Sequence, residues 1–248
     1  MTLANQLAVV TGAASGIGRA TAAALAAQRA RVIVADINAT AGEQAAAELR
    51  AAGHAADFLA VDLTDGDSIA AFADAVQQRH GAVDVLVNAA GWGRTAPFWD
   101  GTPPFWHQVV ALNFVGPVTL TKALLPAMLE RAHGKIVNVA SDAGRVGSLG
   151  EAVYAGAKGG LIAFTKALAR ETARYRVNVN CVCPGPTDTP LMAAVPEKVK
   201  DALVKAIPLR RLGRPQEVAE AIVFFAGPQS DYITGQVLSV NGGLTMVG

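Results

Sequence analysis

The sequence has little charge, few cysteines and no long apolar run. Charged residues make up 17% and hydrophobic residues 52% of the 248 residues, whereas an average soluble domain has roughly 25% charged residues, so much of the chain has to be buried. Lys plus Arg number 21 and Asp plus Glu 20, a balance that gives no field for nucleic acid or anionic lipid. Apolar runs stay shorter than the ~18 residues of a membrane span. We therefore expect a globular protein that binds neither nucleic acid nor membrane.

The scarcity of cysteine excludes two further classes of protein. Cys181 and Cys183 are the only cysteines, too few for a disulfide framework and without the second pair that a structural zinc site needs. We expect two small core residues and no metal. Residues 1–30 lack the basic start, apolar stretch and cleavage site of a secretory signal, so we expect a cytoplasmic protein.

Short β-rich runs alternate with longer Ala-rich stretches along the whole chain. The expected strands are Leu7–Val10, Arg31–Ala35, Phe58–Val61, Val83–Val87, Lys135–Val139, Val177–Val182 and Val237–Val240. The expected helices are Ile17–Gln28, Thr40–Ala52, Asp65–His80, Pro103–Arg131, Val153–Tyr175 and Pro215–Phe225. The early strands are apolar throughout, as parallel strands covered by helices on both faces are. The pattern predicts one α/β domain over residues 1–248, with a doubly wound, mostly parallel seven-stranded sheet.

A glycine-rich loop follows the first expected strand. Its sequence is Thr11-Gly12-Ala13-Ala14-Ser15-Gly16-Ile17-Gly18, and it opens the first expected helix. Glycines permit a sharp turn and let a pyrophosphate approach the helix N-terminus, where free N–H groups favour negative charge. A glycine-rich turn without a ligand is the alternative. The order of strand, loop, helix, strand and acid favours dinucleotide binding.

Asp36 ends the second expected strand and supplies that acid. Its carboxylate can accept hydrogen bonds from both hydroxyls of an adenosine ribose, and it would repel a 2′-phosphate. The neighbours Ile37 and Asn38 are uncharged, whereas a binder of the phosphorylated form usually has Arg or Lys nearby. We therefore expect NAD rather than NADP; a helix cap is the alternative role for Asp36.

Tyr154 and Lys158 stand four residues apart on an expected helix, so they are neighbours on one face. A tyrosine with a pKa of about 10 is a poor base at pH 7. An ammonium about 4 Å away contributes about 4 kcal/mol at an effective dielectric constant of about 20, enough to bring the pKa of the phenol near neutrality. Ser141 follows the fifth expected strand and would lie at the same edge of the sheet. A surface pair is the alternative for Tyr154 and Lys158.

These motifs together closely resemble those of the short-chain dehydrogenase/reductase family, over the whole chain. The resemblance implies a single-domain Rossmann fold and an NAD-dependent oxidoreductase that acts on CH–OH groups. It implies four catalytic residues: Asn113, Ser141, Tyr154 and Lys158. It implies that Tyr154 and Lys158 also bind the cofactor, together with Gly12, Ser15, Gly16, Ile17, Gly18, Asp36, Asp62, Leu63, Asn88, Gly91, Pro184, Gly185, Thr187 and Thr189. One departure is Ala89, where many members have a second Asn.

The resemblance also implies a role for each catalytic residue. Tyr154 would be the general base in oxidation, and Ser141 would hydrogen-bond the substrate oxygen. Lys158 would lower the pKa of Tyr154 and bind the ribose of the nicotinamide half. Asn113 would hold a water that links Lys158 to solvent; from the residues alone, a helix kink beside Gly116 is the alternative.

The substrate is expected to contact Trp92, Ser141, Arg145, Leu149 and Tyr154 and a lid without regular structure over Pro184–Pro196. Three runs, 141–148, 183–189 and 233–240, resemble one branch of the family, the 2-hydroxycyclohexanecarboxyl-CoA dehydrogenases, which are close to the 3-oxoacyl carrier-protein reductases. This resemblance implies oxidation of a 3-hydroxyacyl-CoA. The phosphates of coenzyme A would need basic partners, for which the candidates are Arg94, Arg145, Arg210 and Arg211.

Three other functions stay open at this point. They are a 3-oxoacyl-[acyl-carrier-protein] reductase, a dehydrogenase of free sugars, polyols or steroids, and a non-catalytic dinucleotide sensor. The family resemblance also implies a homotetramer, with apolar faces of the two long helices and the segment Leu238–Val247 at its interfaces. Burial of those faces within one chain is the alternative.

Overall fold

The computed structural model describes residues 2–193 and 195–247, which form a seven-stranded parallel sheet. The strand order is β3-β2-β1-β4-β5-β6-β7. The strands are β1 (Leu7–Thr11), β2 (Arg31–Asp36), β3 (Ala56–Ala60), β4 (Val85–Asn88), β5 (Gly134–Val139), β6 (Val177–Pro184) and β7 (Val237–Val240). The predicted doubly wound sheet is confirmed, with strand boundaries within two residues of those expected.

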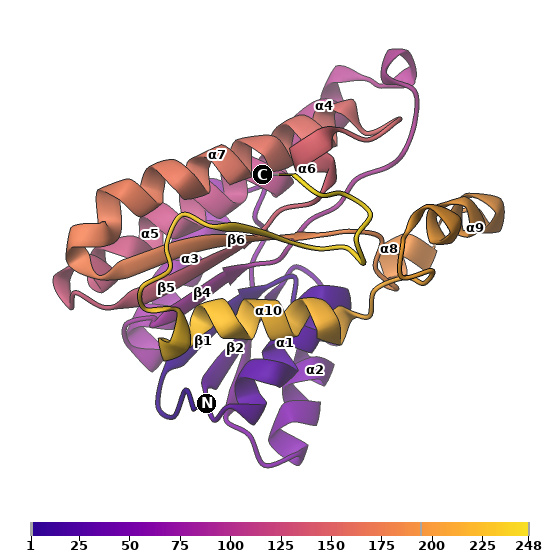
Figure 1. The fold of residues 1–248 in the computed structure, drawn as a ribbon. Helices are drawn as coiled ribbons and strands as arrows, with labels where there is room; N and C mark the ends of the chain where they lie inside the picture. Colours follow the sequence, from indigo (N-terminus) through magenta and orange to yellow (C-terminus); the bar gives the residue numbers. More distant parts are fainter. Residues whose placement is uncertain (1, 194, 248) are drawn as a thin grey trace.

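Helices cover both faces of this sheet. They are α1 (Gly16–Ala27), α2 (Ala39–Ala51), α3 (Gly66–His80), α4 (Pro103–Val110), α5 (Gly116–Glu130), α6 (Ala143–Val146), α7 (Ala152–Thr172), α8 (Pro190–Ala193), α9 (Glu197–Ala206) and α10 (Pro215–Ala226). In Figure 1, α1, α2 and α10 lie on one side and α3, α5 and α7 on the other. Successive residues of a strand point to opposite faces of the sheet, and each face has its own hydrophobic core. Val10 packs in the core that contains Leu25 and Ile222, whereas Val9 packs in the core that contains Leu120.

The order of the strands places a crevice at the middle of the sheet. β1 pairs with β2 on one side and with β4 on the other, so the chain winds outward in opposite directions from these two central strands. In open α/β sheets, ligands bind outside the carboxyl ends of the strands at such a switch point. The fold therefore favours a ligand site at the loops after β1 and β4.

The stretch expected as one helix over Pro103–Arg131 is instead interrupted. A π-helical segment, η2 (Ala111–Val115), separates α4 from α5. The side-chain amide of Asn113 donates to the carbonyl of Val109, four residues earlier, and so takes an acceptor that an α-helix gives to a backbone N–H. The polar side chain and the irregular backbone occur together, and they turn Asn113 toward the loop after β4.

The segment after β6 was expected to lack regular structure up to Pro196, and this expectation is wrong. α8 forms within it, and α9 follows directly after Pro196. No side chain of α9 is buried, and Figure 1 shows this helix standing away from the sheet. Its position is set by its ends, because it has no apolar face in the core.

Candidate active site

The glycine loop meets the loop after β4 at close range. Gly12 has a φ of +65°, and a Cβ on it would come within 2.7 Å of the Cα of Ala90. A Cβ on Gly18 would lie 2.2 Å from the carbonyl oxygen of Gly12, so α1 can begin there only with glycine. The hydroxyl of Thr11 accepts hydrogen bonds from the backbone N–H groups of Ala89 and Ala90, both at 3.1 Å. The two loops are thus fixed together beside the central strands.

The start of α1 can receive an anion. Its N-cap, Ser15, is exposed and makes no capping hydrogen bond, and the first turn carries no acidic residue. Gly16, with a φ of +52°, lies beside Thr189, whose Cγ2 would be 3.4 Å from an added Cβ. Free N–H groups at a helix start favour a phosphate. The start of α1 therefore offers the free N–H groups and the lack of negative charge that a pyrophosphate needs.

Asp36 lies across this loop from the helix start. Its carboxylate accepts hydrogen bonds from the backbone N–H of Ala14, at 3.0 Å, and of Asn38, at 2.9 Å. The helix cap of α2 comes from Asn38, so the alternative role considered for Asp36 is filled by another residue. Each carboxylate oxygen has a further lone pair for a ribose hydroxyl. The residues present fit the adenosine end of a dinucleotide.

The other residues expected at the cofactor differ in how they are placed. Asp62 accepts hydrogen bonds from the backbone and hydroxyl of Thr64, and Leu63 is buried. The side chain of Asn88 is buried and donates to Thr121 and Asn138. It braces β4 against β5, so Asn88 can face a cofactor only through its backbone.

The segment from Pro184 to Thr189 forms the opposite wall of the crevice. A Cβ on Gly185 would lie 2.6 Å from the Cβ of Asn241, so the chain's C-terminal part packs directly against this loop. The hydroxyl of Thr187 donates to the carbonyl of Gly185 at 2.9 Å, and that of Thr189 accepts from Met192. The end of this loop lies beside the start of α1, where Thr189 neighbours Gly16.

Tyr154, Lys158 and Ser141 come together at the same edge of the sheet. The ammonium of Lys158 lies 5.8 Å from the centre of the Tyr154 ring, and Ser141 is close enough to hydrogen-bond the phenol. A Cβ on Gly91 would lie 3.1 Å from the Lys158 ammonium, and one on Gly93 would lie 3.0 Å from the Tyr154 ring. The glycines after β4 thus let the backbone run along both side chains.

The prediction that Lys158 lowers the pKa of Tyr154 is wrong. Burial raises the pKa of Tyr154 to about 12, and the negative charge of Glu151 adds to the rise, against a smaller lowering by Ser141. The Lys158 ammonium donates to the carbonyl of Val139 at 2.9 Å and does not hydrogen-bond the phenol. Burial lowers the pKa of Lys158 to about 8. The phenol is therefore a protonated acid at neutral pH.

Asn113 is fully buried and its side-chain amide is already used. The amide nitrogen donates to the carbonyls of Trp92 and Val109, and the amide oxygen accepts from the N–H of Trp92. The helix is interrupted at this residue by η2, where a kink was considered as the alternative role. The expected water would have to bind through the backbone around Asn113, because these contacts hold its side chain.

The residues expected to contact the substrate differ in how exposed their side chains are. Trp92 is 38% exposed and stands edge-on to Phe105, whereas Leu149 is 97% exposed. A small cavity of about 20 Å³ reaches Tyr154 and is lined by Arg94, Phe98, Phe105 and Trp106 among others. The aromatic side chains that line this cavity, Phe98, Phe105 and Trp106, were not among the expected substrate contacts. The sequence carried a signal for them, because all three tryptophans of the chain fall within residues 92–106.

The guanidinium of Arg145 is turned away from the substrate side, contrary to expectation. It donates to Ser239 and to the carbonyls of Val237 and Val247. These acceptors belong to the C-terminal part of the chain, whose contact with α6 is not visible in local sequence. Arg145 therefore binds this segment and does not face a ligand.

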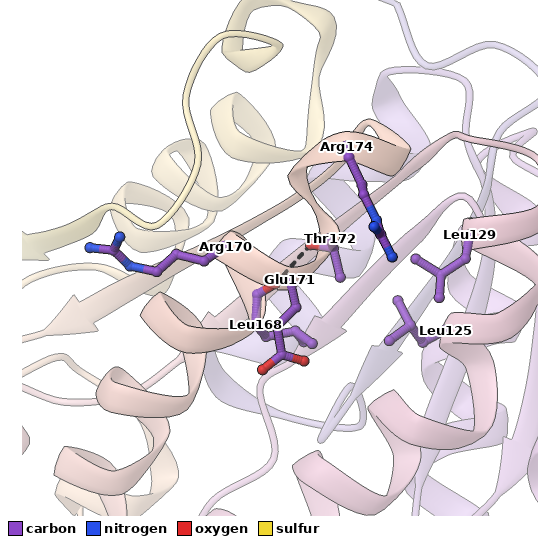
Figure 2. Close-up of a pocket in the computed structure, with 7 residues that line it drawn as sticks. All are labelled: Leu125, Leu129, Leu168, Arg170, Glu171, Thr172 and Arg174. Atoms are coloured by element: carbon purple, nitrogen blue, oxygen red, sulfur yellow. Dashed lines mark hydrogen bonds between the residues drawn. The ribbon is translucent and has the colours of Figure 1, made fainter.

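A larger hollow lies elsewhere, between α5 and the end of α7 (Figure 2). It measures about 490 Å³, and the residues that line it are Leu125, Leu129, Leu168, Arg170, Glu171, Thr172 and Arg174. None of these is a predicted site residue. Among residues 2–193 and 195–247, no three His, Cys, Asp or Glu side chains gather in a way that could hold a metal ion.

The fold and the site define a nicotinamide-dinucleotide oxidoreductase of the doubly wound α/β class. A family described as enoyl-(acyl carrier protein) reductase matches residues 12–245. The chain belongs to the short-chain dehydrogenase/reductase family, as its motifs predict.

Relatives in this family cover the whole chain. The 3-oxoacyl-[acyl-carrier-protein] reductase FabG of Thermotoga maritima is 38% identical over 99% of this chain and 100% of its own. The cis-4-hydroxycyclohexanecarboxylate dehydrogenase of Sinomonas cyclohexanicum is 40% identical over 98% of both chains. The chain is thus similar to enzymes that act on a CH–OH group or the corresponding ketone.

Solved structures agree over the same length. The gluconate 5-dehydrogenase of Burkholderia cenocepacia, in complex with NADP and tartrate, superposes with a TM-score of 0.95 at 34% identity, over 100% of this chain and 98% of that one. A variant of the actinorhodin polyketide ketoreductase with NADPH gives 0.93 at 38% identity, over 97% of both. Both neighbours carry the phosphorylated cofactor, so the choice between NAD and NADP has to be argued from this chain's own residues.

Proposed function

We propose that this enzyme uses NAD(H) to interconvert the alcohol and the ketone of a 3-hydroxyacyl and a 3-oxoacyl thioester, with a cyclic acyl group such as that of 2-hydroxycyclohexanecarboxyl-CoA. The observation that carries the proposal is the placement of Tyr154, Ser141 and Lys158 on one side of the crevice and of Asp36 on the other. The two relatives' names support it, since one concerns a 3-oxoacyl group and the other a cyclohexane ring.

The residues have distinct tasks in the proposed reaction. When bound, the nicotinamide supplies or accepts the hydride at the carbinol carbon. In reduction, Tyr154 donates its hydroxyl proton to the ketone oxygen, and its raised pKa keeps that proton in place at neutral pH. The Ser141 hydroxyl donates a hydrogen bond to the same oxygen and stabilises its developing negative charge. In oxidation, the phenolate of Tyr154 takes the proton back.

Asp36 supports NAD as the cofactor, because its carboxylate would lie where NADP carries a 2′-phosphate. We expect kcat/KM with NADPH to be at least about tenfold lower than with NADH. The Asp36→Ala variant should make the two kcat/KM values more nearly equal, because it removes the carboxylate that repels the 2′-phosphate. Initial rates with both cofactors measure this, and Asp67→Ala, which removes an exposed carboxylate on α3, is the matched control. Equal efficiencies in the unchanged enzyme would contradict the assignment.

Of the four arginines considered for the phosphates of coenzyme A, one suits the role. Arg211 pairs with Glu217 at 2.6 Å, Arg210 donates to a backbone carbonyl, and Arg145 binds the C-terminal segment. Arg94 has no ion pair among the described residues, and it stacks over Phe105 at 5.1 Å on the wall of the cavity that reaches Tyr154. A cation held by a ring and exposed to solvent is available to an anionic ligand.

A panel of substrates tests the thioester. We expect NADH-dependent reduction of 3-oxoacyl-CoA esters to exceed that of free keto acids and sugars at least about tenfold in kcat/KM. Arg94→Gln should lower the value for the CoA ester about threefold, the size of an exposed ion pair, and leave the N-acetylcysteamine thioester of the same acyl group unchanged. Arg211→Gln is the control. Turnover confined to free alcohols would end the thioester proposal.

A 3-oxoacyl-[acyl-carrier-protein] reductase is the second candidate, favoured by the names of several relatives. A preference for NADPH and for the carrier-protein thioester over the CoA ester in the same panel would favour it. The proposal includes a cytoplasmic location and a homotetramer. The homotetramer is supported by the exposed side chains of Leu238 and Met246, which lie near the open edge of β7 and could pack against another subunit.

A further inference from the structure

The carboxylate of Asp142 is buried directly after Ser141, yet the reaction does not use it. Asp142 is 5% exposed and precedes α6. One of its oxygens accepts a hydrogen bond from the hydroxyl of Ser239, and the other accepts from the amide of Asn241 and, at 2.8 Å, from the hydroxyl of Thr245. Three donors stabilise this buried charge, and all three belong to the C-terminal segment, residues 237–247.

The backbone continues the same connection. The N–H of Asp142 donates to the carbonyl of Pro184 at 3.1 Å, and the N–H of Gly185 donates to the carbonyl of Val240 at 3.0 Å. The guanidinium of Arg145 adds hydrogen bonds to the same segment. In Figure 1 the end of the chain lies beside α6. The loop of the catalytic serine, the loop after β6 and the C-terminal segment are therefore tied at one point.

The C-terminal segment in turn holds the end of α9. The N–H of Leu209 donates to the carbonyl of Gly242 at 3.2 Å. A Cβ on Gly242 would lie 2.8 Å from the side chain of Ile207, and one on Gly243 would lie 3.1 Å from Pro208. Ile207, directly after α9, is 1% exposed, whereas α9 itself has no buried residue. This contact anchors the C-terminal end of the outlying helix to the body of the protein.

We propose that Asp142 is a positioning residue: by fastening the C-terminal segment to the Ser141 loop, it sets the position of α9, which follows directly after the segment expected as the substrate lid. The carboxylate thus couples the shape of the substrate site to the catalytic loop. Asp36, which would bind the adenosine half of the cofactor, takes no part in these contacts, so we expect the binding of that half not to depend on this connection. The inference rests on the family's reaction at Tyr154 and not on the identity of the substrate.

Asp142→Ala tests the coupling. It removes the acceptor of three hydrogen bonds, and we expect KM for the substrate to rise about tenfold with a smaller change in kcat, while the NADH dissociation constant stays within about twofold. Trypsin should cut faster within α9 and its end, at Lys198, Lys200 and Lys205. Asp142→Asn keeps one acceptor oxygen for Ser239 and should recover part of the KM.

Asp84→Ala is the matched control. Its carboxylate is also partly buried and accepts from the N–H of Leu7 and from Arg131, but at the opposite edge of the sheet. It should lower the melting temperature and leave KM and the cleavage of α9 unchanged. If Asp142→Ala fails to fold, Thr245→Val removes one of the three hydrogen bonds and should give the same effects on a smaller scale.

Two results would overturn the proposal. One is a folded Asp142→Ala, or a folded Thr245→Val, with unchanged KM and unchanged cleavage of α9. The other is an equal rise in KM in Asp84→Ala, which would show that the rise in Asp142→Ala comes from a general loss of stability and not from the position of α9. If the substrate panel reveals a free alcohol instead of a thioester, KM is measured with that alcohol, and the cleavage and NADH measurements stand as they are.

Discussion

Tyr154→Phe is expected to lower kcat by about 10²–10⁴-fold, the range for loss of a general acid or base. The substitution removes one oxygen and keeps the ring, which packs beside Gly93 and in the cavity lined by Phe105. The affinity for NADH should stay within about twofold, because the glycine loop and Asp36 are untouched. Stopped-flow turnover and fluorescence titration of NADH measure the two effects.

Tyr175→Phe is the matched control, since this tyrosine lies after α7 and contacts Arg174, far from the crevice. Its activity should equal that of the unchanged enzyme. A Tyr154→Phe enzyme that keeps more than about a tenth of the activity would contradict the assignment of Tyr154 as the proton donor.

Lys158→Met is expected to lose activity and gain stability. The two charge-assisted hydrogen bonds to the nicotinamide ribose that the family resemblance implies for Lys158 would be worth about 3 kcal/mol, so kcat/KM should fall about 10²-fold. Burial lowers the pKa of Lys158 from 10.5 to about 8. Between these two values the folded protein binds fewer protons at this site than the unfolded chain does. The cost of burying the ammonium is therefore full below about pH 8 and vanishes as the pH rises above 10.5.

That cost amounts to about 3 kcal/mol at pH 7, and loss of the hydrogen bond to Val139 offsets about 1 kcal/mol of the gain. Urea unfolding at pH 7 should thus show the Met variant about 2 kcal/mol more stable, and the advantage should shrink toward about pH 10. Lys122→Met, which changes a lysine on the outside of α5, is the control. A variant that is less stable at pH 7, or fully active, would contradict this account of Lys158.

The sequence predicted which residues meet, because parallel strands bring their carboxyl ends to one edge. Asp36, Ser141 and the segment after Pro184 follow different strands, and all border the crevice. The alternation of short β-rich runs with longer Ala-rich stretches also predicted the seven strands and most of the helices that cover them. These features depend on local pattern and on the topology that the pattern dictates.

What the sequence could not give depends on contacts between distant segments. Arg145 and Asp142 bind residues about one hundred positions later, which no spacing rule anticipates. The pKa of Tyr154 rises because the folded chain buries the phenol, and spacing on a helix says nothing of burial. The π-helical segment at Asn113 coincides with a hydrogen bond from its side chain to the carbonyl of Val109, which the sequence pattern does not show.

The most direct test of the account is the ionisation of Tyr154 itself, followed as phenolate absorbance between about pH 6 and about pH 10, where free tyrosine begins to ionise. The chain has three tyrosines, so the difference between the unchanged protein and Tyr154→Phe isolates this one. The account predicts no phenolate from Tyr154 in the ligand-free protein over this range, because burial holds its pKa at about 12. With NAD⁺ bound, the added positive charge should bring its ionisation into the range. A Tyr154 that ionises near pH 7 without the cofactor, or whose ionisation NAD⁺ leaves unchanged, would contradict the account.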